Sequence, residues 1–404
     1  MNKLVITSRE DIVCYGYFRD GKAIELYCEK KKSTGLLGNI YVARVTRIAE
    51  GIQGAFLDLT GSDKGYCNLS PTKKPVKLSP GHEDRLYAGD LILVQVRKEG
   101  VGTKLPVVDT RINFTGKYFV FSMEKPGISI SKKIKEKEER ERLMHLAGAW
   151  IREQESLPYH IVIRTNARHT GHEELLRELD ELKVRSDRLM QKARTAPEKT
   201  LLWEEAPFYL RLAKDLPFGR LDQILTDDPR IRDELKEYYQ GEGERPLREK
   251  ICFYQDDYPL YLLYRFDHWY DLALSRRIPL KSGGSIVIDT TEAMVVVDVN
   301  SGSVLKKKKE AETIFESMNK EAASEIIYQL RLRNLSGIIL IDFINMKDAG
   351  SRERVLSALK KEAEGDRIPV RVIDFTALNL VEMTRNKVRK PLKDQWEECH
   401  RIKS

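Results

Sequence analysis

The run SIVIDTTEAMVVVDVN, residues 285–300, and the run GIILIDF, residues 337–343, decide the fold of the C-terminal third of the chain. Each is a short apolar series rich in Val and Ile, which is typical of a strand buried in a sheet. A helix from about 310 to 333 is predicted between them by apolar residues at four-residue spacing, namely Ile314, Met318, Ala322, Ile326 and Leu330. Strand, helix and strand in this order predict an α/β unit.

Both runs place a carboxylate at the end of a strand. Asp298 follows MVVV, Asn300 stands two residues later and so on the same face, and Asp342 follows GIILI. For a single acid at such a position, capping of the next loop is the more common role. Two carboxylates and an amide oxygen beside the basic run Lys306–Lys309 favour a Mg²⁺ site instead, because hard cations take oxygen ligands. A metal ion there could generate hydroxide and stabilise a phosphorane-like transition state.

The rest of the chain divides by pattern. Residues 1–35 read as strands joined by the turn dipeptide Asp20-Gly21, and residues 36–117 carry about five short strands, which suits a small barrel of the oligonucleotide-binding (OB) type. Residues 118–205 alternate strands and helices. A charged helix is predicted over Ile134–Glu155, and Thr170 with Glu173 at the capping-box position predicts the start of another. Residues 206–280 mix short helices and strands.

Composition restricts the class of protein. The chain has 404 residues, 41% of them hydrophobic and 33% charged, as in a globular protein. No apolar run reaches the ~18 residues that a membrane span needs, and the first residues lack the apolar core of a secretory signal, so we expect a cytoplasmic protein. The excess of 70 Lys and Arg over 62 Asp and Glu, a net charge of +8, suits a polyanionic partner. Five cysteines without a C-x-x-C pair indicate neither a zinc ribbon nor a disulfide framework.

Several long strings closely resemble the bacterial ribonuclease E/G family. VVVDVNSG, EAASEIIYQLRLRNLSGIILIDFINM and LVEMTRNKVRKPL resemble its catalytic region. Upstream, GNIYVARVTRIAEGIQGAFLDL resembles its RNA-binding barrel, and KSGGSIVIDTTEA resembles the entry to its catalytic domain. The resemblance extends in order over nearly the whole chain.

This resemblance implies a Mg²⁺-dependent endoribonuclease. Its substrate would be single-stranded, AU-rich RNA such as ribosomal RNA precursors or messenger RNA, with a preference for 5′-monophosphate ends, and its products would carry 5′-phosphate and 3′-hydroxyl ends. The implied fold class is α+β multidomain. Its parts are a ribonuclease-H-like scaffold (1–35 and 206–280), an inserted OB-type barrel (36–117), a mixed α/β 5′-sensor domain (118–205), a DNase-I-like α/β catalytic domain (281–396) and a tail (397–404).

The resemblance also implies roles for individual residues. Asp298 and Asp342 would hold the metal ion, with Asn300 orienting Asp298 or the scissile phosphate. Residues implied to contact RNA are Phe56, Tyr66, Lys104, Lys132 and Lys133. Residues implied to form the pocket for a 5′-monophosphate are Arg164, Thr165 and the backbone of Gly116 and Val120. Without the resemblance, Phe56 and Tyr66 would be read as core residues and the basic residues as ordinary surface residues.

The chain departs from the family pattern at two places. Asn345 stands where the family often has a further acid, which leaves a role for that acid in doubt. Cys399-His400 stands where the family usually carries C-P-x-C, whose thiolates share zinc between subunits, and the small domain that usually follows is absent. We therefore expect no zinc, and a homodimer formed through another surface stays open.

Two other functions compete with this interpretation. A non-catalytic RNA-binding protein, such as a ribosome-assembly factor, would keep the barrel and lose the chemistry, but Asp298, Asn300 and Asp342 argue against it. A deoxyribonuclease is disfavoured because no feature of the sequence suits duplex DNA.

Overall fold

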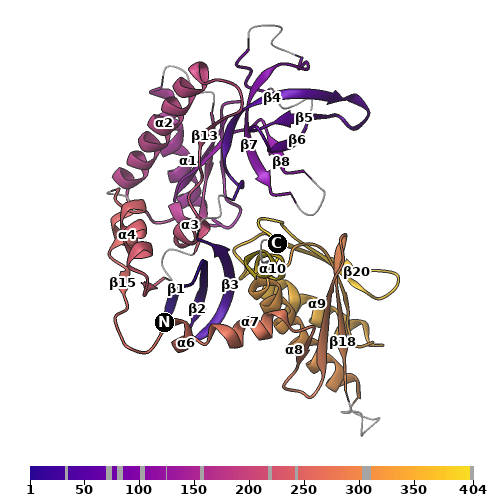
Figure 1. Cartoon of the computed structure of the whole chain (residues 1–404). Coiled ribbons are helices and arrows are strands. Elements are labelled where there is room, and N and C mark those ends of the chain that lie inside the picture. The colour runs from indigo at the N-terminus through magenta and orange to yellow at the C-terminus, as the bar shows by residue number, and fades with distance from the viewer. Residues whose placement is uncertain are drawn as a thin grey trace. The chain divides into compact units, whose positions relative to one another are not determined.

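The structure is a computed structural model of the whole chain, shown in Figure 1. It describes residues 1–31, 35–69, 75–79, 85–100, 105–123, 125–154, 159–216, 221–241, 244–302 and 311–400. The chain forms two compact units, the first of Met1–Ser33, Gly219–Gln240 and Leu247–Ser404, and the second of Thr34–Phe218 and Gly241–Pro246. No helix in the described ranges has the length and apolar character needed to cross a bilayer.

The first unit contains a five-stranded sheet in the order β15-β14-β1-β2-β3. The N-terminal strands β1 (Asn2–Arg9), β2 (Ile12–Arg19) and β3 (Lys22–Lys30) form an antiparallel meander. β14 (Gln223–Thr226) lies parallel to β1, and β15 (Ile251–Phe253) lies parallel to β14. The helices of this part are α4 (Pro229–Tyr238), α6 (Leu260–Leu263), α7 (Phe266–Leu274) and α10 (Leu392–His400).

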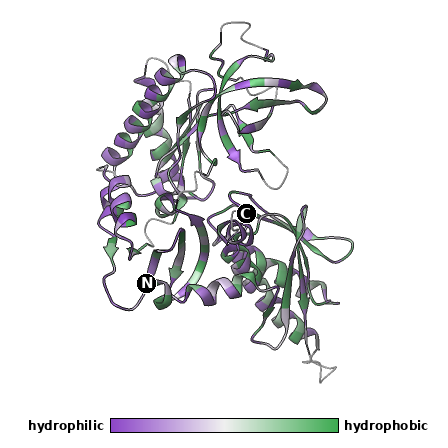
Figure 2. Ribbon diagram, viewed as in Figure 1, coloured by the Kyte–Doolittle hydropathy of each residue, from purple (hydrophilic) through white to green (hydrophobic). Residues whose placement is uncertain are grey.

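The first unit also contains a six-stranded sheet in the order β16-β17-β18-β19-β21-β20. Its strands are β16 (Arg277–Pro279), β17 (Ser285–Thr290), β18 (Met294–Asn300), β19 (Gly337–Asp342), β20 (Val370–Phe375) and β21 (Val381–Arg385). The helix predicted between the two apolar runs is α8 (Ala311–Leu332), which connects the parallel strands β18 and β19, and α9 (Ala349–Ala363) packs beside it. The apolar colour of these strands is visible in Figure 2.

The second unit contains a closed five-stranded barrel, which is consistent with the OB-type barrel predicted from residues 36–117. Its strands are β4 (Ile40–Ala49), β5 (Gly54–Asp58), β6 (Lys64–Asn68), β7 (Leu91–Lys98) and β8 (Val107–Asp109), and pairing of β4 with β7 closes it. A short 3₁₀ turn, η1 (Glu50–Ile52), joins β4 to β5. The later strand β13 (Thr200–Trp203) adds to the edge of β4.

The second unit continues in a four-stranded sheet in the order β11-β12-β10-β9. Its strands are β9 (Asn113–Thr115), β10 (Phe119–Met123), β11 (Gly127–Ile130) and β12 (Tyr159–Ile163). Helices α1 (Lys137–Arg152) and α2 (His172–Thr195) share one buried core with this sheet, and α3 (Phe208–Asp215) follows β13. The elements that remain are η2 (Thr165–Ala167) and α5 (Arg245–Arg248).

The start of α2 differs from the prediction. The helix is capped by Gly171, not by Thr170, and no side chain caps its N-terminus. The Thr170 hydroxyl instead donates to the carbonyl oxygen of Asn166 at 3.2 Å. The predicted capping box is therefore wrong, because the turn that precedes the helix already uses the Thr170 hydroxyl.

Candidate functional site

The two strand-end carboxylates lie opposite each other in the sheet. β18 and β19 run parallel in a register that pairs Asp298 with Asp342. Parallel strands place their carboxyl ends at the same edge, so a crossover through α8 brings together two acids that are 44 positions apart in the sequence.

Strand alternation explains why both carboxylates face away from the core. Val295, Val297 and Val299 of β18 are buried in a cluster with Ile339 and Ile341 of β19 and with apolar residues of α8. Successive side chains of a strand point to opposite faces, so the residues between these valines and isoleucines face the side without α8. Asp298 and Asp342 are both exposed there.

The electrostatics of the pair favour a cation. The Asn300 side-chain amide donates to the Asp298 carboxylate at 2.8 Å, which fixes one carboxylate and leaves the amide oxygen available. Partial burial, and then the neighbouring charge of Asp298, raises the pKa of Asp342 above its usual range. Two hard oxygen donors that repel each other fit a divalent ion. Within the described ranges no set of three or more His, Cys, Asp or Glu side chains is arranged to hold a metal ion, so the remaining ligands of such an ion would be water or substrate oxygens.

The segment after β19 is held by amides. The Asn379 side chain donates to the Asn345 oxygen at 3.1 Å, and Arg352 approaches the Asn379 oxygen at 3.5 Å. Asn345 therefore serves in a hydrogen-bonded loop next to the strand end. The basic run Lys306–Lys309 lies outside the described residues.

Arg164 is held at the end of β12 by three contacts. Its backbone N–H donates to Tyr118 O at 2.7 Å. One guanidinium nitrogen donates to the Gly116 carbonyl oxygen, and the other pairs with the Asp215 carboxylate of α3 at 2.9 Å. The backbone N–H of Gly116 is donated to Phe119 O, so Gly116 offers its carbonyl oxygen to Arg164 and not an N–H to a ligand.

The other residues expected near Arg164 come from β10 and β11. Val120 stands in β10 between Thr115 of β9 and Val162 of β12. Because β11 runs parallel to β12 with Ile130 opposite Ile163, Ser131 follows beside Arg164, and its hydroxyl lies 2.8 Å from that of Thr165. The exposed Lys132 and Lys133 come directly after Ser131.

Glu178 of α2 holds the hairpin that carries Gly116. Its carboxylate accepts the backbone N–H groups of Lys117, Tyr118 and Phe119 at 3.0, 2.7 and 2.9 Å. A Cβ atom on Gly116 would lie 2.2 Å from Glu178 Oε1, so a larger residue there would displace the carboxylate from its three N–H donors. Burial raises the pKa of Glu178, and the three N–H groups oppose that shift.

The two barrel aromatics form one outward-facing pair. Phe56 of β5 and Tyr66 of β6 are cross-strand partners, both half-buried, with ring centroids 5.6 Å apart at 60°. The Arg47 guanidinium lies 4.5 Å from the Phe56 ring centroid. The Tyr66 ring covers Gly54, where a Cβ would lie 2.5 Å from it. Neither ring belongs to the barrel core, and Lys104 lies outside the described residues.

Cys399 is buried in the first unit. It lies on α10 in the cluster that also contains Cys14 and Cys28, which are partners across β2 and β3. A hydrogen bond between the Cys28 and Cys399 thiols raises the pKa of Cys28.

Three residues of these sites escaped the sequence analysis. Asp215 and Glu178 act on partners 51 or more positions away, and each looks like one more acid in a charged helix. Arg47 is also unremarkable in sequence, although the hairpin that follows it, with Gly51 in its turn, brings Phe56 back beside it. For Asp215 and Glu178, only the long-range pairing reveals the contact.

Comparison with known proteins gives consistent matches. The model of the ribonuclease E/G family matches residues 113–388. Ribonuclease G of Escherichia coli (strain K12) is 32% identical over 398 residues, which cover 95% of this chain and 80% of that protein. Ribonuclease G of Haemophilus influenzae is 32% identical over 394 residues, covering 94% and 79%. Ribonuclease E of Nostoc sp. is 31% identical over 357 residues, covering 87% of this chain and 51% of that protein.

Proposed function

The chain belongs to the ribonuclease E/G family and is an endoribonuclease, and we propose that it hydrolyses single-stranded, AU-rich RNA with Mg²⁺ and prefers 5′-monophosphate ends. Its products would carry 5′-phosphate and 3′-hydroxyl ends, in maturation of ribosomal RNA or decay of messenger RNA. The observation that carries this proposal is the register of β18 and β19, which sets Asp298 opposite Asp342.

The two carboxylates share one task in the proposed reaction, and Asn300 has another. Asp298 and Asp342 hold the metal ion, and the Asn300 amide keeps the Asp298 carboxylate in place through its 2.8 Å hydrogen bond. The ion, when bound, supplies Lewis-acid stabilisation of the charge on the scissile phosphate and lowers the pKa of a water. The exposed face around the two carboxylates leaves room for the RNA backbone to approach them.

Cleavage of defined RNAs tests this function. The purified chain should cut a short single-stranded AU-rich RNA with Mg²⁺ and leave it intact in EDTA. A duplex of the same sequence should resist cleavage, and the downstream product should carry a 5′-phosphate. Binding of RNA without cleavage would support the rival, non-catalytic function, and cleavage in EDTA would contradict the metal-dependent chemistry.

We infer that Arg164 recognises the 5′ end of the RNA. Its planar guanidinium suits a terminal monophosphate, and the Gly116 carbonyl oxygen and Asp215 hold it in orientation. The Thr165 hydroxyl lies beside that of Ser131, the exposed Lys132 and Lys133 come directly after Ser131, and Val120 stands in the neighbouring strand β10. A 5′-hydroxyl gives this group no anion to bind.

A matched pair of arginine variants tests the sensor. A charge-assisted hydrogen bond is worth about 1.5–3 kcal/mol, so a 5′-monophosphate should raise the cleavage rate roughly ten- to a hundredfold. Arg164→Ala should erase this preference and leave cleavage of 5′-hydroxyl RNA unchanged. Arg168→Ala removes an exposed arginine paired with Glu136 and should keep the preference. Full preference in Arg164→Ala would place the sensor elsewhere.

A further inference from the structure

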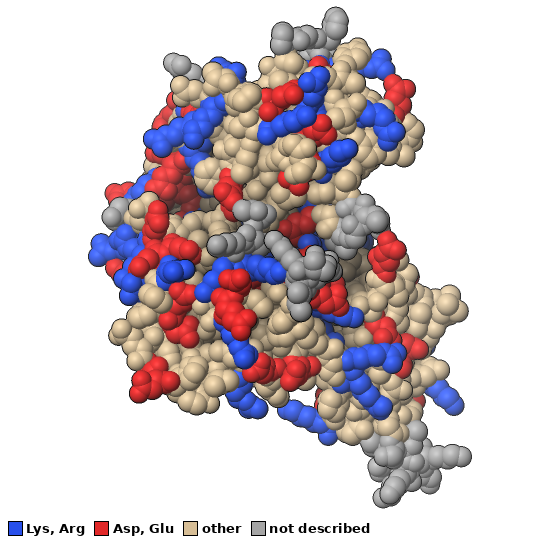
Figure 3. Space-filling model, in the orientation of Figure 1, with Lys and Arg blue, Asp and Glu red and all other residues tan. Residues whose placement is uncertain are grey.

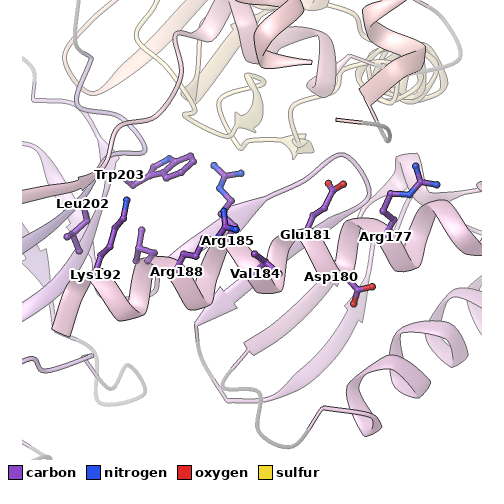
Figure 4. A pocket seen from close by; sticks show the side chains of 10 residues that line it. Arg177, Asp180, Glu181, Val184, Arg185, Arg188, Lys192, Leu202 and Trp203 are labelled. Carbon is purple, nitrogen blue, oxygen red and sulfur yellow. The ribbon is translucent and has the colours of Figure 1, made fainter. Parts of the chain in front are cut away.

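A groove runs along the outer face of α2 in the second unit. It has a volume of about 560 Å³, within the range of ligand-binding pockets, and lies between α2 and the end of β13 (Figure 4). Cations along it are Arg177, Arg185, Arg188 and Lys192, which recur at intervals of eight, three and four residues and so share one face of the helix. None of the roles assigned above uses this groove.

The groove combines an aromatic surface with three exposed cations. The Arg185 guanidinium lies 3.9 Å from the Trp203 ring centroid, so the two side chains form a stacked platform. Arg177, Arg188 and Lys192 are exposed, and within the described part of the chain none of them makes an ion pair. Because α2 rises ~1.5 Å per residue, Arg177 and Lys192 are separated by roughly 22 Å along the helix, which spans several nucleotides of an extended strand.

The acids of the groove do not cancel its charge. Asp180 points away from Trp203 in Figure 4 and accepts the Trp150 ring N–H at 2.8 Å. Glu181 rises on the same side as Arg185 and Arg177. Burial, and then the charge of Glu244, raises the pKa of Glu181, and the charges of Arg177 and Lys214 oppose that shift. Four cations therefore line the groove with two carboxylates, and one of these, Asp180, is turned away and bound to Trp150.

The groove is built on elements that also bear on the residues proposed to contact RNA. Trp203 ends β13, which pairs with β4 beside the strand of Phe56. Arg177 adjoins Glu178, whose carboxylate holds the hairpin of the proposed 5′ sensor. Surfaces that bind single-stranded nucleic acid combine cations along the path of the phosphate backbone with an aromatic face on which bases stack.

We propose that this groove is a second docking site for single-stranded RNA, which binds part of the substrate strand away from the catalytic carboxylates. The phosphates would lie along Arg177, Arg188 and Lys192, and a base would stack on the platform of Arg185 and Trp203. The proposal rests on the proposed function, and it adds an anchoring contact that sets the affinity for longer substrates.

Binding of unstructured RNAs of increasing length to the full chain in EDTA, where cleavage is suppressed, tests the groove. Arg188→Glu should weaken binding of the longer RNAs about tenfold and reduce the slope of log affinity against log salt by about one. Trp203→Leu should weaken binding about five- to tenfold and leave that slope unchanged. Arg194→Glu is the control, because it makes the same charge change in an exposed residue of α2 that does not line the groove.

The outcomes separate failure of the groove from failure of the function. Equal RNA affinities of Arg188→Glu and Arg194→Glu would overturn the proposal that the groove binds RNA. A lower RNA affinity of Phe56→Ala in the same series would show that the barrel still binds RNA. No binding by the parent chain would overturn the proposed function together with the groove. Displacement of RNA from the groove by polyglutamate, which has charge and no bases, would assign this surface to an acidic protein. Thermal melts identify any variant that fails to fold.

Discussion

At the scale of single residues, Asp298 and Asp342 place two like charges in register, an arrangement that costs stability. They occupy directly opposite positions on parallel strands, and Asn300 stabilises only one of them. The charge of Asp298 disfavours that of Asp342, which destabilises the folded state unless a cation lies between them. Sequence predicted the two acids and their strand ends, and the structure adds the register that pairs them.

The repulsion gives a pH-dependent difference in stability. The pKa of Asp342 is raised in the folded state, so the contribution of this group is favourable at low pH and is lost as the pH rises through the raised value. In EDTA, the melting temperature of Asp342→Asn should therefore increase relative to that of the parent as the pH rises above about 3.9, the usual Asp pKa. Mg²⁺ should raise the melting temperature of the parent and not of the variant. An Asp342→Asn protein less stable than the parent in EDTA at pH 7 would contradict this.

The barrel aromatics make a second prediction at this scale. Phe56 and Tyr66 are half-buried and outside the core cluster, so alanine at either position should weaken RNA binding by about 1–3 kcal/mol, the value of one stacked base. A core aromatic would instead cost about 3–5 kcal/mol of stability when replaced by alanine. An RNA titration beside a urea unfolding curve measures both quantities. A large loss of stability with unchanged RNA binding would indicate that the two rings have a structural role and do not bind RNA.

At the scale of elements, α2 connects two surfaces with different tasks. On one side Glu178 accepts three N–H groups of the β9–β10 hairpin, and on another the cations of the groove face outward. The hairpin in turn presents the Gly116 carbonyl oxygen to Arg164. The geometry of the proposed 5′ sensor therefore depends on a helix that contributes no ligand to it.

Replacement of Glu178 tests this dependence. Glu178→Ala leaves three backbone N–H groups without their acceptor, which should cost about 3 kcal/mol of unfolding free energy. It should also reduce the preference for 5′-monophosphate RNA, because Gly116 would no longer be held. Glu178→Gln keeps one side-chain oxygen and should lose less of both. Unchanged stability and full preference in Glu178→Ala would exclude the positioning role; urea unfolding and cleavage rates measure the two effects.

Local patterns predicted the elements better than their ends and partners. Four-residue spacing of apolar residues identified α8, and short apolar or β-prone runs identified the strands around it and the barrel, because these signals lie within a few residues of each other. The capping box at Thr170 failed because a hydrogen bond to Asn166 uses its hydroxyl. Asp215 and Trp203 could not be found, because their roles depend on contacts with residues distant in sequence.

At the scale of the whole molecule, charges of both signs are intermixed over the surface seen in Figure 3, so the net charge of +8 does not form one basic face there.

Within the first unit, a buried ion pair joins the two sheets. Glu25 of β3 accepts from Arg367, which precedes β20, at 2.9 Å, and it lies 3.6 Å from Arg331 of α8. Glu25 is 1% exposed.

Removal of this acid should destabilise the first unit. Glu25→Ala leaves Arg367 and Arg331 without their buried partner, at a cost of about 3–5 kcal/mol. Burial alone would raise the pKa of Glu25, but Arg367, Arg331 and Tyr27 lower it, so its contribution is present above the usual Glu pKa and lost as the pH falls through the lowered value. Asp289→Ala, which removes an exposed pair with Arg276, should cost far less, because water and salt screen exposed pairs. Equal losses in urea unfolding at pH 7 would contradict the assignment.

The rate of Mg²⁺-dependent RNA cleavage by single-residue variants tests the central claim most directly. Asp298→Asn and Asp342→Asn should each lower the rate about a thousandfold or more, since each removes a metal ligand, while RNA binding in EDTA stays within about twofold of the parent. Asp374→Asn changes another exposed acid of the same sheet and should retain the parent rate. A rate near that of the parent in either Asp298→Asn or Asp342→Asn would contradict the assignment of the catalytic metal site.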